Sequence, residues 1–252
     1  MKRVLIITVA AALAVPAAVA AAGWLYEGKW GRSGSGNGEF VNPEGVAVGT
    51  GGIVYVADCI NSRVQYFTPT GSFLGKWGTP GTGNGQFGKL EGIAFAPDGR
   101  LYVADTANHR VQYFTSTGSF LGKWGSFGTG DGEFNNPAGI AVAEKGAVYV
   151  ADSSNDRVQY FNRSGSFLGK WGPPHPMNIL DYPQDLAVAA NGNVYVADTR
   201  HDKVKYFTAT GSYLGEWGGR GWADGQFYDP NGIEVAPDGR IFVSDTNNCR
   251  IQ

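Results

Sequence analysis

Short apolar runs alternate with glycine-containing turns through most of the chain. In residues 92–125 the runs lie in GIAF, RLYVAD, RVQYF and SFLGKWG. Ala96-Pro97-Asp98-Gly99 separates the first two runs and Thr115-Ser116-Thr117-Gly118 the last two, and such sequences are typical of tight hairpin turns. The pattern therefore predicts four short antiparallel strands, over residues 92–95, 100–105, 110–114 and 119–125.

The same pattern recurs along the chain. The stretch VYVADCINSRVQYF at residues 54–67 has counterparts beginning at Leu101, Val148, Val194 and Ile241, and its aspartate recurs at intervals of 47, 47, 46 and 47 residues. A unit of four strands cannot bury both faces alone, so it must pack against its neighbours. The repeat predicts an all-β fold, a β-propeller of four-stranded antiparallel blades. Tryptophans recur in the fourth strand and are predicted to pack between blades: Trp30, Trp77, Trp124, Trp171 and Trp217.

The two ends of the chain bear on the number of blades. GWLYEGKWG at residues 23–31 matches a fourth strand, and the last unit stops at Gln252 inside its third strand. We therefore expect five blades, closed by the N-terminal strand. The alternative is a six-bladed propeller with a truncated C-terminus.

The first segment has the order of a secretory signal peptide. Lys2 and Arg3 precede an apolar stretch, and small residues follow near Ala20 and Ala22. We predict a signal peptide over residues 1–22, a propeller over 23–252, and a secreted, periplasmic or cell-surface location. Cleavage would leave 18 basic and 22 acidic residues. This balance argues against nucleic acid as a partner and limits membrane attachment to an uncleaved N-terminal segment.

The quoted units resemble the NHL-repeat family of β-propellers. The resemblance rests on P-x-G-[IV]-A-V, YVAD-x-x-N-x-R-V-Q-Y-F and G-S-F-L-G-K-W-G, and it covers the chain after the signal segment. It implies one of several roles: a protein-binding platform, a surface sensor, an RNA binder or a zinc-dependent amidating lyase. The lyase places zinc-binding histidines just after the proline that opens the innermost strand, where this chain has none. A secreted binding module is the implied role that fits best.

The repeated Asp58, Asn61 and Arg63 trio is interpreted as structural. A catalytic site is needed once, whereas the aspartate and a basic residue five positions later recur in every unit. We expect the aspartate to accept backbone N–H groups and the arginine to pair with a carboxylate. The glycine-rich connectors, such as GTGNGQF, lack the following helix of a phosphate-binding loop and are predicted to be turns between blades.

Ligand contacts are expected where the copies differ. The residue after the opening proline varies and should lie at one mouth of the central channel; these residues are Glu44, Glu91, Ala138, Gln184 and Asn231. The same face should carry the loops after each second strand. The candidates from those loops are Asn61, His109, Asp156, His201 and Asn248. Simple solvation of the channel is the alternative interpretation.

One connector breaks the pattern. PPHPMNILDYP at residues 173–183 replaces the glycines and supplies His175, Met177 and Tyr182 as candidate partner contacts. The alternative is drift that packs onto the blades.

These observations predict a monomeric, exported binding module for a protein or peptide at the channel mouth, without a metal or other cofactor. The rival is a lactonase- or lyase-like enzyme that uses a divalent cation held by Glu44 and Glu91. Whether Cys59 and Cys249 form a disulfide is left open, since both lie in loops of blades that a closed five-bladed ring would bring together.

Overall fold

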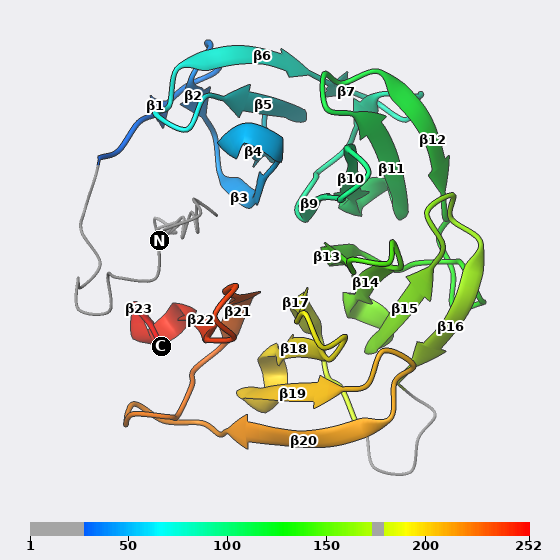
Figure 1. The fold of residues 1–252 in the computed structure, drawn as a ribbon, viewed down its shortest axis with the longest axis vertical. Helices are drawn as coiled ribbons and strands as arrows, with labels where there is room; N and C mark the ends of the chain where they lie inside the picture. The colour runs from blue at the N-terminus through cyan, green and yellow to red at the C-terminus, as the bar shows by residue number, and fades with distance from the viewer. Residues whose placement is uncertain (1–27, 173–178) are drawn as a thin grey trace.

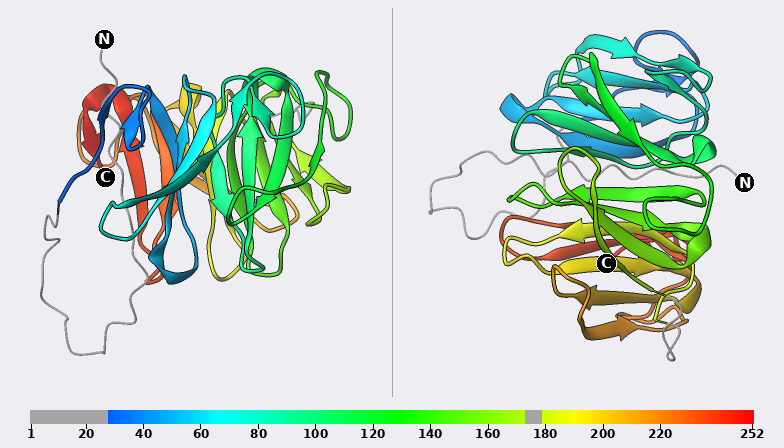
Figure 2. Two further views of the ribbon diagram at one scale, coloured as in Figure 1. Left: turned by 90° about the horizontal axis from the view of Figure 1, so that it is seen from above. Right: turned by 90° about the vertical axis from the view of Figure 1, so that its right-hand side faces the viewer.

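The computed structural model describes residues 28–172 and 179–252. Its sheets stand like blades around a central axis, with their first strands innermost (Figures 1 and 2). The predicted β-propeller of four-stranded antiparallel blades is therefore confirmed. The predicted signal peptide, residues 1–22, lies outside the described residues. Within the described residues, no helix is long and apolar enough to cross a membrane.

The strands follow the repeat unit by unit. Blade 1 comprises β3 (Pro43–Val48), β4 (Val54–Asp58), β5 (Arg63–Phe67) and β6 (Phe73–Trp77). Blade 2 comprises β9 (Ile93–Phe95), β10 (Arg100–Asp105), β11 (Arg110–Thr115) and β12 (Phe120–Trp124). Blade 3 comprises β13 (Pro137–Val142), β14 (Val148–Asp152), β15 (Arg157–Phe161) and β16 (Phe167–Trp171). Blade 4 comprises β17 (Pro183–Val188), β18 (Val194–Asp198), β19 (Lys203–Phe207) and β20 (Tyr213–Gly218). Blade 5 has β21 (Pro230–Val235), β22 (Ile241–Asp245) and β23 (Arg250–Ile251).

Short elements join the strands. A single 3₁₀ turn follows the second strand in four blades: η2 (Thr106–Asn108), η3 (Ser153–Asn155), η4 (Thr199–His201) and η5 (Thr246–Asn248). Blade 1 has a 3₁₀ turn between its first two strands, η1 (Thr50–Gly52). The glycine-rich connectors form two-residue parallel pairs, β1 (Arg32–Ser33) with β2 (Glu39–Phe40) and β7 (Thr79–Pro80) with β8 (Gln86–Phe87). The connectors are thus interblade turns, as predicted.

Aromatic side chains fill the space between blades. The Trp77 ring of blade 1 lies 5.8 Å from the Phe114 ring of blade 2, and the connector residue Phe87 lies 5.7 Å from the same ring. The equivalent contacts recur around Phe161. Because a Cβ on Gly125 would come within 2.6 Å of the Phe134 ring, glycine is required at this position, where φ is also +101°. The tryptophans are structural, as predicted.

Each repeated aspartate holds the preceding connector against its blade. Buried Asp105 accepts hydrogen bonds from the backbone N–H of Gly88 (2.9 Å), the Asn108 amide (3.0 Å) and Arg110 Nε (2.7 Å). Arg110 also donates hydrogen bonds from Nη1 to the Thr82 carbonyl and from Nη2 to the carbonyls of Gly83 and Gln86. Gln112 also donates to Asp105 and to the Gln86 carbonyl. We call this network the connector clamp, and it confirms the structural interpretation of the trio.

The clamp recurs with Asp58, Asp152 and Asp245. Blade 4 differs, because His201 replaces the asparagine, Lys203 the arginine and Lys205 the glutamine. Lys205 Nζ contacts Asp198 at 2.6 Å and donates to the Ile179 carbonyl at 2.6 Å. Blade 4 therefore keeps the aspartate, although its side-chain partners differ from those of the other blades. The connector that these partners hold differs as well.

Among the described strands, β21 and β3 do not lie beside each other in Figure 1, whereas the other innermost strands are neighbours in chain order. Among the described residues the last sheet has three strands. Residues 28–31 of the expected closing strand form no strand, and residues 23–27 lie outside the described part. Trp30 nevertheless packs on Phe67 of blade 1, with ring centroids 6.2 Å apart, as Trp77 packs on Phe114. Trp30 thus occupies, against blade 1, the place that Trp77 occupies against blade 2.

The two cysteines are both free thiols. Cys59 is buried, and burial raises the pKa of its thiol to about 12. Cys249 is exposed at the C-terminal edge of η5.

The connector clamp leads to a stability prediction. Asp105→Ala should lower the free energy of unfolding by about 3–5 kcal/mol, because the buried Arg110 guanidinium would lose its counter-charge. The control is Asp238→Ala, which removes an exposed partner of Arg240 and should change stability by less than about 1 kcal/mol. Urea unfolding of the two variants checks this, and equal destabilisation would contradict it.

Candidate functional site

The innermost strands begin together at one mouth of the channel. Pro43 pairs with Asp58 across β3 and β4, so the start of each innermost strand and the loop after each second strand lie on the same face. The channel encloses about 410 Å³, and its lining includes the five variable residues Glu44, Glu91, Ala138, Gln184 and Asn231. The structure thus brings together the ring of residues singled out in the sequence.

Lys89 stands between the two glutamates of this ring. Its ammonium group contacts the Glu91 carboxylate and lies 3.7 Å from that of Glu44. Partial burial lowers the pKa of Lys89, but the hydrogen bond and charge of Glu91 outweigh it, so the net shift is upward. Lys89 therefore remains charged and occupies the place where a cation between these glutamates would bind. No group of three or more potential metal ligands occurs in the described ranges.

Three of the loop candidates belong to connector clamps. Asn61 donates to Asp58 at 3.0 Å and to the Gly34 carbonyl at 3.0 Å, and Asn248 makes the equivalent bonds in blade 5. His201 Nδ1 lies 2.7 Å from an Asp198 oxygen. These hydrogen bonds give the three side chains a structural role in the scaffold. That the same side chains contact a ligand stays a prediction.

His109 and Asp156 connect neighbouring blades. His109 Nδ1 accepts a hydrogen bond from the Asn136 backbone N–H (3.1 Å), and Asp156 accepts one from that of Tyr182 (2.8 Å). Both residues have a positive φ at the end of their 3₁₀ turns. Their role as ligand contacts likewise stays a prediction.

Of the candidates in the variant connector, Tyr182 is described and faces the mouth. The Arg200 guanidinium stacks over its ring, 4.5 Å from the centroid. His175 and Met177 lie outside the described residues.

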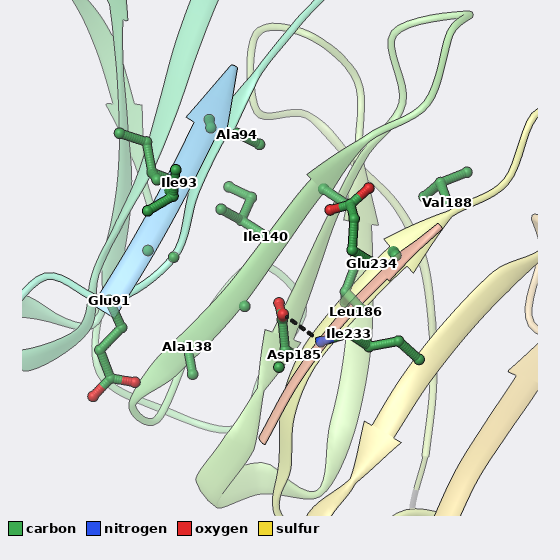
Figure 3. Close-up of a pocket in the computed structure, with 18 of the residues that line it drawn as sticks. Glu91, Ile93, Ala94, Ala138, Ile140, Asp185, Leu186, Val188, Ile233 and Glu234 are labelled. Atoms are coloured by element: carbon green, nitrogen blue, oxygen red, sulfur yellow. Dashed lines mark hydrogen bonds between the residues drawn. The ribbon is translucent and has the colours of Figure 1, made fainter. Parts of the chain in front are cut away.

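Two acidic residues of the channel wall were missed by the sequence reasoning. Asp185 stands where the other blades have Gly45, Gly92, Gly139 and Gly232, and Glu234 stands where they have Ala47, Ala94, Ala141 and Ala187. Comparison of the units at every position, rather than only after the proline, would have found both. In Figure 3, Glu91 and Ala138 lie where their strands begin, and Glu234 lies farther along the channel.

The environment of Asp185 differs from that of its glycine counterparts. Gly92 is the counterpart of Asp185 in blade 2, and a Cβ on Gly92 would come within 2.2 Å of the Ala138 carbonyl of blade 3. An aspartate at this position therefore needs a wider separation between neighbouring innermost strands than a glycine does. The Asp185 carboxylate reaches from β17 of blade 4 to β21 of blade 5, where it accepts a hydrogen bond from the Ile233 backbone N–H at 3.0 Å (Figure 3). Burial raises the pKa of Asp185 to about 7, against the opposing effect of its backbone hydrogen bonds, and the charge of Glu234 adds to the increase. Desolvation by the surrounding channel wall also raises the pKa of Glu234, against the opposing effect of a hydrogen bond from the Val235 backbone N–H, although its side chain is exposed to the channel.

Comparisons with known families agree with the fold. A family model described as a 6-bladed β-propeller matches residues 82–186, and the NHL repeat model matches residues 40–67, 180–207 and 227–252. These ranges fall in all the blades of the described structure. No curated protein matches the chain.

Solved structures resemble the chain at low sequence identity. A streptogramin B lyase is 17% identical with a TM-score of 0.63, and the match covers 83% of this chain but only 63% of the lyase. Virginiamycin B lyase from Staphylococcus aureus is 14% identical with a TM-score of 0.60, covering 83% and 68%. A protein of unknown function from Bacteroides caccae is 16% identical with a TM-score of 0.60, covering 81% and 70%. At these identities the likeness concerns the fold alone.

The raised pKa of Asp185 predicts a pH effect on stability. The folded protein holds this proton more tightly than the unfolded chain, so the stabilisation is complete below about pH 4 and is lost as the pH rises through about 7. Asp185→Asn stays neutral and can still accept the Ile233 N–H. From pH 5 to pH 8 the wild type should therefore lose about 1–3 kcal/mol relative to this variant.

The measurement is urea unfolding of both proteins at the two pH values. Glu144→Gln, which removes an exposed carboxylate on the opposite rim, controls for the loss of one negative charge. A constant difference between the wild type and Asp185→Asn would show that Asp185 titrates normally.

Proposed function

Because the chain is an NHL-repeat β-propeller, we propose that it is a binding module that presents its channel mouth to a protein or peptide. The main support is that the scaffold contacts are the same in successive blades while the residues at the channel mouth differ. The connector clamps and interblade aromatic contacts recur from blade to blade, whereas the five residues around the mouth differ in size, charge and hydrogen-bonding capacity. Positions free of the common packing requirement are the ones at which a ligand can be recognised.

The charge of this face favours some partners over others. Four carboxyl groups line the channel, those of Glu44, Glu91, Asp185 and Glu234, and no lysine, arginine or histidine is among the lining residues in the described part of the chain. Lys89, beside the mouth, offsets one of these charges, so the mouth is acidic by less than its carboxyl count. A basic or neutral peptide segment fits such a mouth, and a nucleic acid backbone does not.

The proposed setting follows from the N-terminal segment. Lys2, Arg3 and the apolar stretch after them support export, with the module acting as a monomer in a secreted, periplasmic or cell-surface location. Contact with a membrane would then occur only through an uncleaved N-terminal segment.

The rival proposal is a lactonase- or lyase-like enzyme. The carboxyls of Asp185 and Glu234 favour it, because raised pKa values in a channel suit general acid catalysis, and two of the similar structures are lyases. The divalent cation that this rival needs would have to displace Lys89 from between Glu44 and Glu91. The binding proposal is therefore more consistent with the contacts at the mouth than the enzyme proposal is.

The binding proposal is tested with peptides selected from a displayed library on the purified wild-type chain. Asn231→Arg, which places a bulky side chain at an exposed mouth position, should weaken binding of the selected peptides at least 10-fold, as measured by fluorescence anisotropy. The matched control is Glu144→Arg, at an exposed position on the opposite rim, which should bind like the wild type.

Binding should also persist in EDTA, because no metal takes part in the proposed contacts. Equal binding by wild type and Asn231→Arg would contradict the use of the mouth. Binding that needs a divalent cation, and is lost in Glu44→Gln or Glu91→Gln, would favour the rival.

A further inference from the structure

A second hollow opens beside the channel on the mouth face. It encloses about 220 Å³ and spans blades 2, 3 and 4, so it does not depend on how the ring closes. Its lining comprises Lys89, Glu91, Thr106, Ala107, Asn136, Ala138, Tyr182 and Gln184. Sites for drug-sized ligands begin at about 300 Å³, so this hollow has room for one ring-sized group.

Two alanines create the hollow. Ala138 occupies the variable mouth position at which the other blades have Glu44, Glu91, Gln184 and Asn231. Ala107 occupies a loop position at which they have Ile60, Ser154, Arg200 and Asn247. Because larger residues are accommodated at both positions elsewhere in the same scaffold, the space results from side-chain choice and is not required by the fold.

A buried hydroxyl without a partner lines the hollow. Thr106 is 5% exposed, and its Oγ1 makes no hydrogen bond within the described residues. The equivalent hydroxyls of blades 3 and 4 are engaged, since Ser153 donates to the Pro183 carbonyl at 2.5 Å and Thr199 to that of Pro230 at 2.7 Å. A buried hydroxyl left unpaired is unfavourable by about 1–3 kcal/mol, so a ligand that pairs with Thr106 gains from it.

The remaining polar groups offer both donors and acceptors. Asn136 Nδ2 donates to Ser154, and the Gln184 amide makes no hydrogen bond to another side chain or backbone group of the described part. The Lys89 ammonium is paired with Glu91 and lies near Glu44. An anionic ligand would meet these carboxylates, and a cationic one would meet Lys89. Neutral hydroxyl groups, which both donate and accept, match this lining.

We propose that this hollow binds one neutral saccharide ring, with Thr106, Gln184 and Glu91 as hydrogen-bonding partners and Tyr182 as an aromatic wall. The inference rests on the proposed binding role of the mouth face, but it requires no protein partner. Tyr182 is suited to this place because Arg200 and the Asp156 hydrogen bond hold its ring and backbone.

The experiment measures saccharide binding to the purified chain by saturation-transfer NMR and titration calorimetry. The probes are glucose, galactose, mannose, N-acetylglucosamine and their methyl glycosides, and an immobilised oligosaccharide ending in each. We expect at least one to bind. Binding of the free sugar and its glycosides indicates a soluble ligand, and binding of the oligosaccharide alone indicates a glycan end.

Two variants test the site itself. Ala138→Gln introduces the residue found at the equivalent position of blade 4, Gln184. Its larger side chain should fill the hollow and weaken saccharide binding at least 10-fold. Thr106→Val keeps the shape of the hollow but removes the hydroxyl, and should weaken binding about 5- to 10-fold without lowering Tm, because Thr106 has no protein partner to lose. Glu144→Arg, at an exposed position on the opposite rim, should bind saccharide like the wild type.

Failure of all saccharides to bind, or binding that survives Ala138→Gln, would overturn the inference. The same variants separate this failure from that of the proposed function. If Asn231→Arg weakens peptide binding but no saccharide binds, only the saccharide site is lost. If a saccharide binds, its binding is abolished in Ala138→Gln, and the selected peptides bind Asn231→Arg as they bind the wild type, only the proposed peptide-binding role is contradicted.

Discussion

The buried aspartate at the end of each second strand is the interaction on which the molecule depends. In blades 1, 2, 3 and 5 its carboxylate accepts hydrogen bonds from a backbone N–H of the preceding connector, from an asparagine amide, and from the arginine that also binds the connector carbonyls. In this way one ionic group ties each blade to the chain that arrives from its neighbour. A charge so deeply buried is tolerated only when it is hydrogen-bonded and paired with a cation, and in every blade the aspartate has both kinds of partner, including blade 4, where His201 and Lys205 supply them.

This scaffold leaves the mouth free to vary. The loop residues that reach the next blade are fixed by their contacts, as His109 and Asp156 show. The five variable residues at the mouth, which follow the opening prolines or their counterpart Leu90, carry no such requirement. They can be acidic, amide or alanine without disturbing the clamp, and the same scaffold thereby offers an acidic channel and a neutral hollow side by side.

Much of the fold could be read from the sequence because the repeat imposes the same solution in every unit. The strands, the interblade tryptophans and the structural role of Asp58, Asn61 and Arg63 follow from spacing and turn chemistry. The position of Lys89 between Glu44 and Glu91 could not be read in full, since one of these contacts crosses between blades. The hollow was also out of reach, because Ala107 and Ala138 come from different blades and only the fold places them together. Asp185 and Glu234 were within reach, as substitutions of a repeated glycine and alanine.

Native-state hydrogen exchange tests the central role of the aspartates most directly. The connector amides of Val41, Gly88, Asn135, Asp181 and Tyr228 lie outside every strand, yet each donates to a buried aspartate. If the clamps hold the ring together, these amides should exchange as slowly as those of the second strands, through opening of whole blades. Exchange as fast as that of the exposed turns on the opposite rim would contradict the account.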